Sequence, residues 1–147
     1  MNLKLNLARG IKVDTEDLYL LQQYLFHVTD KGYAATTIGG KYVKLHKLIM
    51  PDDEQVDHRN HDGLDNRRTN LRYATLGEQA RNKRKYSNNS SGFKGVSQNN
   101  TNWCALIRVD GKRIHLGTFI TKEEAARVYD AAAKKFHGEF AYINFPD

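Results

Sequence analysis

The chain has 147 residues, 39% of them hydrophobic, and a formal net charge of +6 at neutral pH. This length and polarity allow one modest core or two small ones, and no apolar run approaches the length of a membrane span. The only cysteine, Cys104, excludes an intramolecular disulfide and a zinc site built from several thiolates, so no structural zinc is expected. The polar first six residues do not fit a signal peptide, so we expect an intracellular protein that is not secreted.

The positive charge is concentrated in residues 67–94, which contain eight Lys and Arg residues and one Glu. Asn, Ser and Gly separate these charges, as in surfaces that contact a phosphate backbone. A solvated basic linker is the alternative. We call these eight residues the basic stripe: Arg67, Arg68, Arg72, Arg81, Lys83, Arg84, Lys85 and Lys94.

The first 50 residues predict a helix followed by short strands. Leu18, Leu21 and Leu25 recur at helical spacing, and turn residues at 30–32 and 39–40 separate the expected strands. The next part of the chain predicts two strands, at 56–58 and 69–74, with a polar loop between them. A helix should follow from 76 to about 84, because Thr75 and Glu78 form a capping box.

An acid and an imidazole stand side by side in the first of these two strands. His58 can act as a general base, because the pKa of an imidazole lies near neutrality. Asp57 offers a hard oxygen ligand for Mg²⁺ or Mn²⁺. Hydrolysis of a phosphodiester requires a base that activates water and positive charge near the developing oxyanions. The pair by itself is a weak signal, but together with the asparagine-rich loop that follows and the polar side chains that open the next helix it indicates phosphodiester hydrolysis with one divalent metal.

Residues 40–84 resemble the HNH endonuclease family, whose motif folds as two strands and a helix around one metal (a ββα-metal fold). By position, the resemblance implies Asp57 as a metal ligand, His58 as the general base and Asn70 as the residue that braces the loop. Gln79 stands where family members usually have a metal-ligating Asn or His, and its amide oxygen sits on a longer arm.

Other polar residues near this motif leave alternatives open. Asn82, one helical turn after Gln79, is a second candidate ligand. Asn66 fits equally well as a site residue or as a loop residue that satisfies backbone groups. We expect His46 and His61 to be structural or solvated rather than catalytic.

The polar run at 85–91 predicts a linker, and a small sheet should follow it. Asp110 and Gly111 form a hairpin signal between strands at 103–109 and 112–119. A third strand is expected at 93–97, which completes a three-stranded antiparallel sheet.

A helix should cover one face of this sheet. It is expected to begin at the capping box of Thr121 and Glu124 and to end near Gly138. Strand parity puts Trp103 under the helix. The opposite face is predicted to be free and basic, and it carries Arg108, Arg113 and His115.

Residues 92–147 resemble the AP2 DNA-binding domain over essentially their whole length. The elements that carry the resemblance include Phe93-Lys94-Gly95-Val96, Leu116-Gly117-Thr118-Phe119 and Asn144-Phe145-Pro146. In that family the sheet enters the major groove, and Lys94, Arg108 and Arg113 match its basic DNA-contacting positions. His115 stands where the plant relatives usually have Trp, so their base preference is not inherited.

Together these features predict an α+β chain with an HNH nuclease domain at 1–84, a linker at 85–91 and an AP2-like domain at 92–147. The expected function is a metal-dependent DNA endonuclease of the homing, mobile-element or phage type, which nicks double-stranded DNA in the cytoplasm of a bacterial or phage-infected cell. We expect a monomer or a DNA-assembled dimer. The alternative is a DNA-binding regulator with a vestigial nuclease. The expected DNA contacts are Arg67, Arg68, Lys83, Arg84, Lys94, Arg108, Arg113 and His115.

Overall fold

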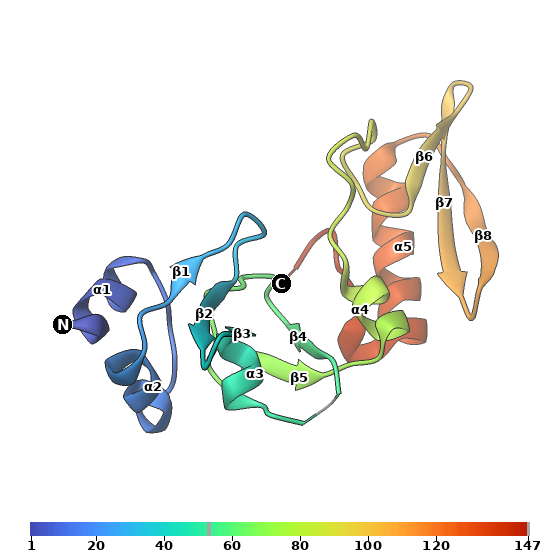
Figure 1. Cartoon of the computed structure of the whole chain (residues 1–147). Coiled ribbons are helices and arrows are strands. Elements are labelled where there is room, and N and C mark those ends of the chain that lie inside the picture. Colours follow the sequence, from blue (N-terminus) through green and yellow to red (C-terminus); the bar gives the residue numbers. More distant parts are fainter. Residues whose placement is uncertain (53, 147) are drawn as a thin grey trace. The chain divides into compact units, whose positions relative to one another are not determined.

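A computed structural model describes residues 1–52 and 54–146 of the chain. It is a mixed α and β structure with small antiparallel sheets, and it divides into two compact units, Met1–Leu76 and Gly77–Asp147 (Figure 1). We describe each unit by itself. No helix among the described residues is long and apolar enough to cross a bilayer.

The first unit begins with two short helices and a three-stranded sheet. The elements are α1 (Asn2–Ala8), the 3-10 turn η1 (Thr15–Asp17), α2 (Leu18–Gln23), β1 (His27–Val28), β2 (Ala34–Ile38), β3 (Lys41–Lys44) and α3 (Leu45–Ile49). The strands pair antiparallel in the order β1-β2-β3, with turns where the glycines and Asp30 predicted them.

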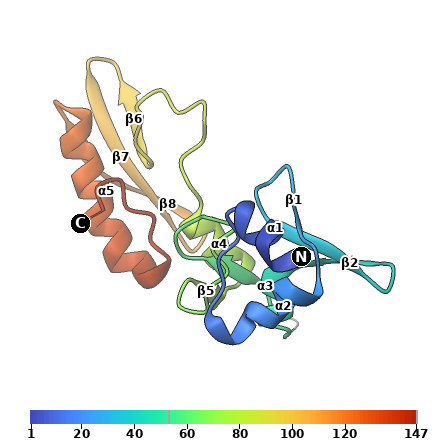
Figure 2. The ribbon, with the colours of Figure 1, turned by 90° about the vertical axis from the view of Figure 1, so that its left-hand side faces the viewer.

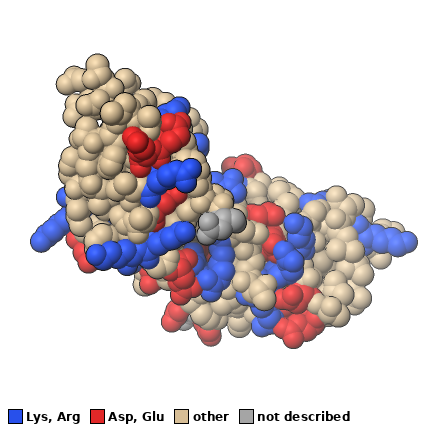
Figure 3. All heavy atoms as spheres, turned by 180° about the vertical axis from the view of Figure 1, so that it is seen from behind, with Lys and Arg blue, Asp and Glu red and all other residues tan. Residues whose placement is uncertain are grey.

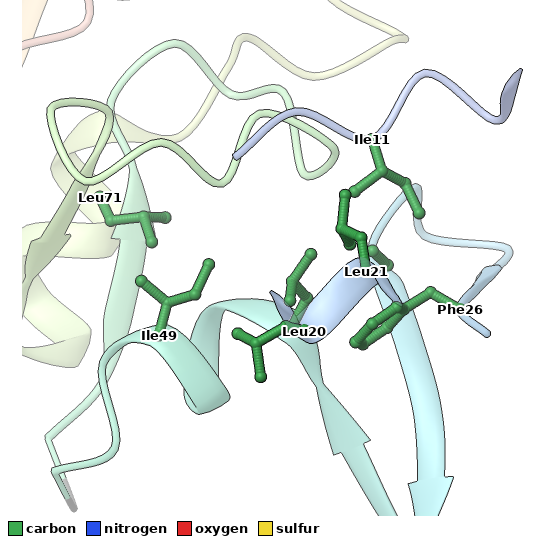
Figure 4. Packing of buried hydrophobic residues seen from close by; sticks show 8 residues of the cluster. Ile11, Leu20, Leu21, Phe26, Ile49 and Leu71 are labelled. Atoms are coloured by element: carbon green, nitrogen blue, oxygen red, sulfur yellow. The ribbon is translucent and has the colours of Figure 1, made fainter. Parts of the chain in front are cut away.

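The core of the first unit joins these elements to the HNH motif. Figure 4 shows Ile11, Leu20, Leu21 and Phe26 pointing into a common interior with Ile49. Leu71 of the motif belongs to the same cluster. The N-terminal elements therefore supply the apolar support on which the motif packs.

The motif itself contains the predicted pair of strands. β4 (Val56–His58) and β5 (Leu71–Tyr73) pair antiparallel, and His58 lies opposite Leu71 in the register. The helix α4 (Leu76–Asn82) begins where the sequence predicts and ends two residues before the expected limit near 84.

The second unit is the predicted sheet covered by one helix. β6 (Val96–Asn99), β7 (Asn102–Val109) and β8 (Lys112–Phe119) form an antiparallel sheet in that order, followed by α5 (Lys122–His137) and the 3-10 turn η2 (Gly138–Phe140). Figures 1 and 2 both show α5 lying along one face of this sheet. Alanines of α5 form much of the contact, so the helix can approach the strands closely.

The turn and cap predictions in this unit are confirmed. Asp110 and Gly111 both have positive φ, 48° and 79°, as the tight hairpin turn requires. Thr121 and Glu124 form both hydrogen bonds of a capping box at the start of α5. The first strand differs from its predicted range, since it spans Val96–Asn99 and not 93–97.

A β-bulge on β8 interrupts the simple alternation of side chains between the two faces of the sheet. Ala105 pairs with Gly117, while Leu106 pairs with His115, so Leu116 is the extra residue. The bulge returns Phe119 to the helix-covered side, where it packs with Trp103. Strict alternation from His115 would have turned Phe119 outward.

Candidate active site and DNA-binding face

Asp57 lies on β4 and forms an ion pair with Arg72 on the neighbouring strand. Oδ2 of Asp57 accepts hydrogen bonds from Nε of Arg72 at 3.1 Å and from Nη2 at 2.9 Å. The two side chains are 15% and 6% exposed. Arg72, which the sequence places in the basic stripe, therefore bonds to the carboxylate of the predicted metal ligand.

His58 is buried and bonds to Asn66. Its Nε2 lies 3.3 Å from Oδ1 of Asn66, and Nδ2 of Asn66 donates to the carbonyl of Gly63 at 3.3 Å. Because the amide oxygen can only accept, Nε2 of His58 carries the proton and Nδ1 is the basic nitrogen. Burial lowers the pKa of His58, and the hydrogen bond to Asn66 opposes that shift.

Two further rings surround this imidazole. The ring of His46 packs edge-on against His58 with centroids 5.1 Å apart, and the ring of Tyr33 lies 5.6 Å from His58. His46 is itself buried, and burial lowers its pKa to about 3. His46 is therefore a neutral packing partner of His58 at physiological pH.

The loop between the two strands is held by polar side chains. Nδ2 of Asn70 donates to the carbonyl of Asp65 at 2.7 Å and to Oδ1 of Asn60 at 2.9 Å. Oδ1 of Asn70 accepts from the amide of Asn60 at 3.0 Å. Nδ2 of Asn60 in turn donates to the carboxylate of Asp65 at 3.0 Å. Asn70 thus bridges the two ends of the loop that also supplies Asn66.

The two arginines predicted to contact DNA from this loop each bind an acid. Arg67 donates from Nε and Nη2 to both carboxylate oxygens of Asp65, and Arg68 does the same to Asp17. Hydrogen bonds from Arg67 lower the pKa of Asp65 to about 2. Both arginines remain about half exposed, at 50% and 49%. Asp65 lies two residues before Arg67, just outside the stretch 67–94 over which the charges were counted, whereas Asp17 lies 51 residues from Arg68.

The helix α4 carries the remaining predicted ligand. Gln79 is partly exposed and Asn82 is buried. Both belong to the second unit, whereas Asp57 and His58 belong to the first, so their combination in one metal site stays a prediction. Within residues 1–52 and 54–146, no three His, Cys, Asp or Glu side chains gather in a group that could hold a metal ion. A metal at Asp57 would therefore need amide or phosphate oxygens as further ligands.

The outer face of the second sheet carries the predicted basic residues. Arg108 and Arg113 are directly opposite each other on β7 and β8, and both are exposed. His115 is also exposed, and its Nε2 lies 3.4 Å from Oγ1 of Thr118. Thr118 in turn contacts Sγ of Cys104 at 3.5 Å. Trp103 lies on the other side, packed with the helix-facing cluster.

Arg81 of the basic stripe lies in the last turn of α4, and the remaining members follow this helix. Lys83 and Arg84 are exposed and, with Lys85 and Lys94, line a pocket of about 210 Å³. In Figure 3, Lys and Arg side chains lie beside Asp and Glu over the first unit. The net charge of the chain therefore does not show that many of its basic side chains lie beside acidic ones.

The comparisons with known proteins match both units. The sequence pattern of the family described as HNH endonuclease matches residues 50–81. An uncharacterised HNH endonuclease of Acanthamoeba polyphaga mimivirus is 32% identical over 133 residues, which cover 85% of this chain and 69% of that protein. The chain belongs to the HNH endonuclease family.

An AP2-like region is also present. An ethylene-responsive transcription factor-like protein of Arabidopsis thaliana is 48% identical over 56 residues, which cover 38% of this chain and 25% of that protein. An AP2/ERF and B3 domain-containing transcription factor of the same plant is 46% identical over 59 residues, which cover 40% of this chain and 17% of that protein. The chain spans a quarter or less of these plant proteins, so the likeness concerns one domain.

Proposed function

We propose that this chain is a metal-dependent endonuclease that hydrolyses phosphodiester bonds of double-stranded DNA, of the kind found in mobile genetic elements and phages. The observation that carries the proposal is the environment of His58. Its buried imidazole is next to Asp57 and is oriented through Nε2 by Asn66. An imidazole held in one tautomer suits a general base, whereas a solvated surface histidine has no such constraint.

In the proposed reaction, the oxygen of a water molecule attacks phosphorus and the bond from phosphorus to the 3′ oxygen breaks. Nδ1 of His58 takes the proton of that water. The departing 3′ oxygen takes a proton from solvent water, so the products carry a 5′-phosphate and a 3′-hydroxyl. Nε2 remains a donor to Asn66 in both protonation states, so the ring keeps its orientation while Nδ1 gains a proton. Asn70 supports this arrangement by holding the loop that contains Asn66.

Asp57 is the proposed metal ligand from β4, and the amide oxygen of Gln79 is the proposed second ligand, with Asn82 as its alternative. These oxygens suit a hard divalent cation such as Mg²⁺ or Mn²⁺. Such an ion, when bound, stabilises the negative charge that develops on the phosphate. Arg72 is proposed to hold the carboxylate of Asp57 in position for this role.

The AP2-like region is the proposed target-binding module. Arg108, Arg113 and His115 on its outer face are the proposed groove contacts, and Lys83 and Arg84 are proposed phosphate contacts. The half-exposed guanidinium groups of Arg67 and Arg68 are further proposed phosphate contacts, which they would make while bound to their acids. One active site per chain supports nicking of a single strand, by a monomer or a dimer assembled on DNA.

A DNA-binding regulator with an inactive nuclease is the second candidate function. Two observations favour it: Gln79 replaces the usual Asn or His, and Arg72 already supplies a positive charge to Asp57. Both functions share DNA binding and differ only in cleavage.

Supercoiled plasmid distinguishes the two functions. The full chain with Mg²⁺ or Mn²⁺ should convert supercoiled plasmid to the nicked form, and EDTA or His58→Ala should abolish this conversion. His61→Asn is the matched control, because it removes an imidazole of the same loop and Asn tolerates the positive φ of 62° found there. A wild-type chain that shifts DNA on a gel but leaves plasmid intact with either metal would favour the regulator.

A further inference from the structure

Lys94 lies near the start of the AP2-like domain, and its side chain hydrogen-bonds to the backbone at the end of α4. Nζ of Lys94 donates to the carbonyl oxygen of Arg81 at 2.6 Å and to that of Lys83 at 2.7 Å. Arg81 lies in the last turn of α4, and Lys83 directly follows the helix. The three residues belong to the same compact unit.

The last carbonyls of a helix have no acceptor role inside the helix and carry the negative end of its dipole. The ammonium group of Lys94 donates to one of these carbonyls, that of Arg81, and to the carbonyl of Lys83 just after the helix, and its positive charge complements the negative end of the dipole. The helix α4 has only seven residues, and helices of that length depend on tertiary contacts. Burial lowers the pKa of Lys94 to about 8, so the ammonium remains mostly charged at neutral pH.

The backbone of Lys94 is itself fixed to the helix-covered core of the second unit. Its amide donates to Oδ1 of Asn144 at 2.7 Å, and Nδ2 of Asn144 donates back to its carbonyl at 3.1 Å. Asn144 is held by the buried Asp130 of α5, which accepts from both the amide and Nδ2 of Asn144 at 2.9 Å. A continuous set of hydrogen bonds therefore leads from α5 through Lys94 to α4.

A second tie joins the same elements and is weaker. Nη2 of Arg81 lies 3.3 Å from Oδ1 of Asp110 in the β7–β8 turn, and the side chain of Asp110 is 82% exposed. An exposed pair of this kind contributes little to stability. Of these two ties, the hydrogen bonds of Lys94 are the shorter and the less exposed.

We propose that Lys94 is a positioning residue that fastens α4 to the DNA-binding module, and that it is not primarily a contact to DNA. The proposal rests on the function proposed above, in which α4 carries the metal-ligating amide of Gln79. The module proposed to bind DNA then also holds α4, the helix that carries Gln79, within the same compact unit.

The test uses the full chain with Lys94→Met, which keeps the length of the side chain and removes its donors. We expect backbone amides of residues 79–84 to exchange with solvent about tenfold faster than in the wild type, while amides of β7 are unchanged. DNA affinity should change by less than about threefold, and single-turnover cleavage of saturated DNA should fall by about tenfold or more. Lys94→Arg should restore both properties in large part, because it returns donors and charge.

Arg113→Ala is the matched control, since it removes a cation from the outer face of the same sheet. It should weaken DNA binding and leave exchange in α4 unchanged. A Lys94→Met variant that behaves like this control, with a salt dependence of binding reduced by about one unit, would make Lys94 a DNA contact and overturn the proposal. Unchanged exchange in α4 would also overturn it.

The exchange measurement needs neither metal nor DNA, so it separates this proposal from the nuclease proposal. Faster exchange in α4 together with a wild-type chain that cleaves nothing would support the fastening role and reject the nuclease. If Lys94→Met fails to fold, exchange in Lys94→Gln provides the comparison, because its uncharged and shorter side chain cannot make both hydrogen bonds of the ammonium group. Faster exchange of α4 in Lys94→Gln than in the wild type, with β7 unchanged, would support the role, and unchanged exchange in both elements would overturn it.

Discussion

Asp57 and Arg72 face each other across β4 and β5, and two nitrogens of Arg72 share one carboxylate oxygen of Asp57. Both side chains are largely removed from solvent. Arg72→Met should therefore destabilise the chain by about 3 kcal/mol, because it leaves a buried carboxylate without its cation. Urea denaturation measures this loss.

The same variant tests whether Asp57 binds metal. Added Mn²⁺ should raise the free energy of unfolding more in Arg72→Met than in the wild type, because the ion then provides the missing positive charge. Asp57→Asn should gain nothing from Mn²⁺. Lys12→Met is the control, since its ion pair with Asp62 is exposed and should be worth less than about 1 kcal/mol. Equal gains in all four proteins would argue against a metal at Asp57.

Buried His46 makes stability depend on pH. Its pKa is about 3 in the folded chain and about 6.5 when unfolded, so the unfolded state binds more protons between these values. Stability from this group is complete above pH 6.5 and is lost as pH falls towards 3, by up to about 1.4 kcal/mol per pH unit. His46→Phe should flatten this dependence in urea denaturation between about pH 7 and pH 4.

His58 also has a lowered pKa, so some pH dependence should persist in His46→Phe. The exposed His27 provides the control, because His27→Phe removes an imidazole without changing the buried cluster. A slope in His46→Phe equal to that of the wild type would contradict the prediction.

Gly95 is required by the close approach of Tyr129. A Cβ at Gly95 would lie 1.9 Å from a ring carbon of Tyr129 and 2.8 Å from the carbonyl oxygen of Leu106, and the φ of Gly95 is +76°. Gly95→Ala should destabilise the second unit by about 3 kcal/mol or more, through overpacking and strain together. The single tryptophan, Trp103, reports unfolding of this unit by fluorescence.

Gly92→Ala separates the two causes. Gly92 has nearly the same φ, +79°, but a Cβ there would meet nothing within 4 Å. This variant should lose only the strain, about 1 kcal/mol. Similar losses at both positions would mean that the ring contact is unimportant.

Arg108 and Arg113 place like charges opposite each other in the absence of DNA. Such pairs destabilise a sheet slightly, so Arg108→Ala should leave the free chain as stable or a few tenths of a kcal/mol more stable. The same change should weaken DNA binding by about tenfold and leave single-turnover cleavage of saturated DNA unchanged. Lys135→Ala, on the exposed side of α5, is the control and should affect neither. If Arg108→Ala binds DNA as tightly as the wild type, the outer face of this sheet is not the DNA-binding face.

The longer arm of Gln79 should not be required for cleavage. Gln79→Asn keeps the amide oxygen and shortens the side chain to that of the usual family residue, so it should preserve or raise the rate of plasmid nicking. A loss of about tenfold, equivalent to about 1.4 kcal/mol, would indicate that the length of Gln79 is needed or that Asn82 is the true ligand.

Local signals in the sequence were sufficient for most elements near the site. The Asp110-Gly111 turn and the capping box of α5 depend on residues a few positions apart, and both are present. The first strand of the second sheet was shifted from its predicted range. Gly95 has a positive φ just before this strand and lies close to the ring of Tyr129, and hydrophobic alternation reports neither feature.

In the candidate site, too, some features follow from local sequence and others depend on the tertiary structure. The position of His58 beside Asp57 follows from the motif. The sequence does not decide whether Asn66 is a site residue or only a loop residue, and the structure shows that it bonds to the imidazole of His58. Arg67 pairs with Asp65 only two residues away, but the ion pair of Arg68 with Asp17 and the bond from Lys94 to the end of α4 have no local signal. These last two contacts depend on which long side chains the fold brings together.

The sequence by itself determined the family and the order of strands and helices from residue 56 onward, because turns, caps and motifs are encoded over short stretches. It did not predict the short helices α1 and α3, which depend on tertiary packing. Only the tertiary structure decided which charges are already paired within the protein and which nitrogen of His58 is basic. Those properties depend on distances of a few ångströms between side chains, several of which come from residues far apart in the chain. Charge counts and spacing cannot give such distances.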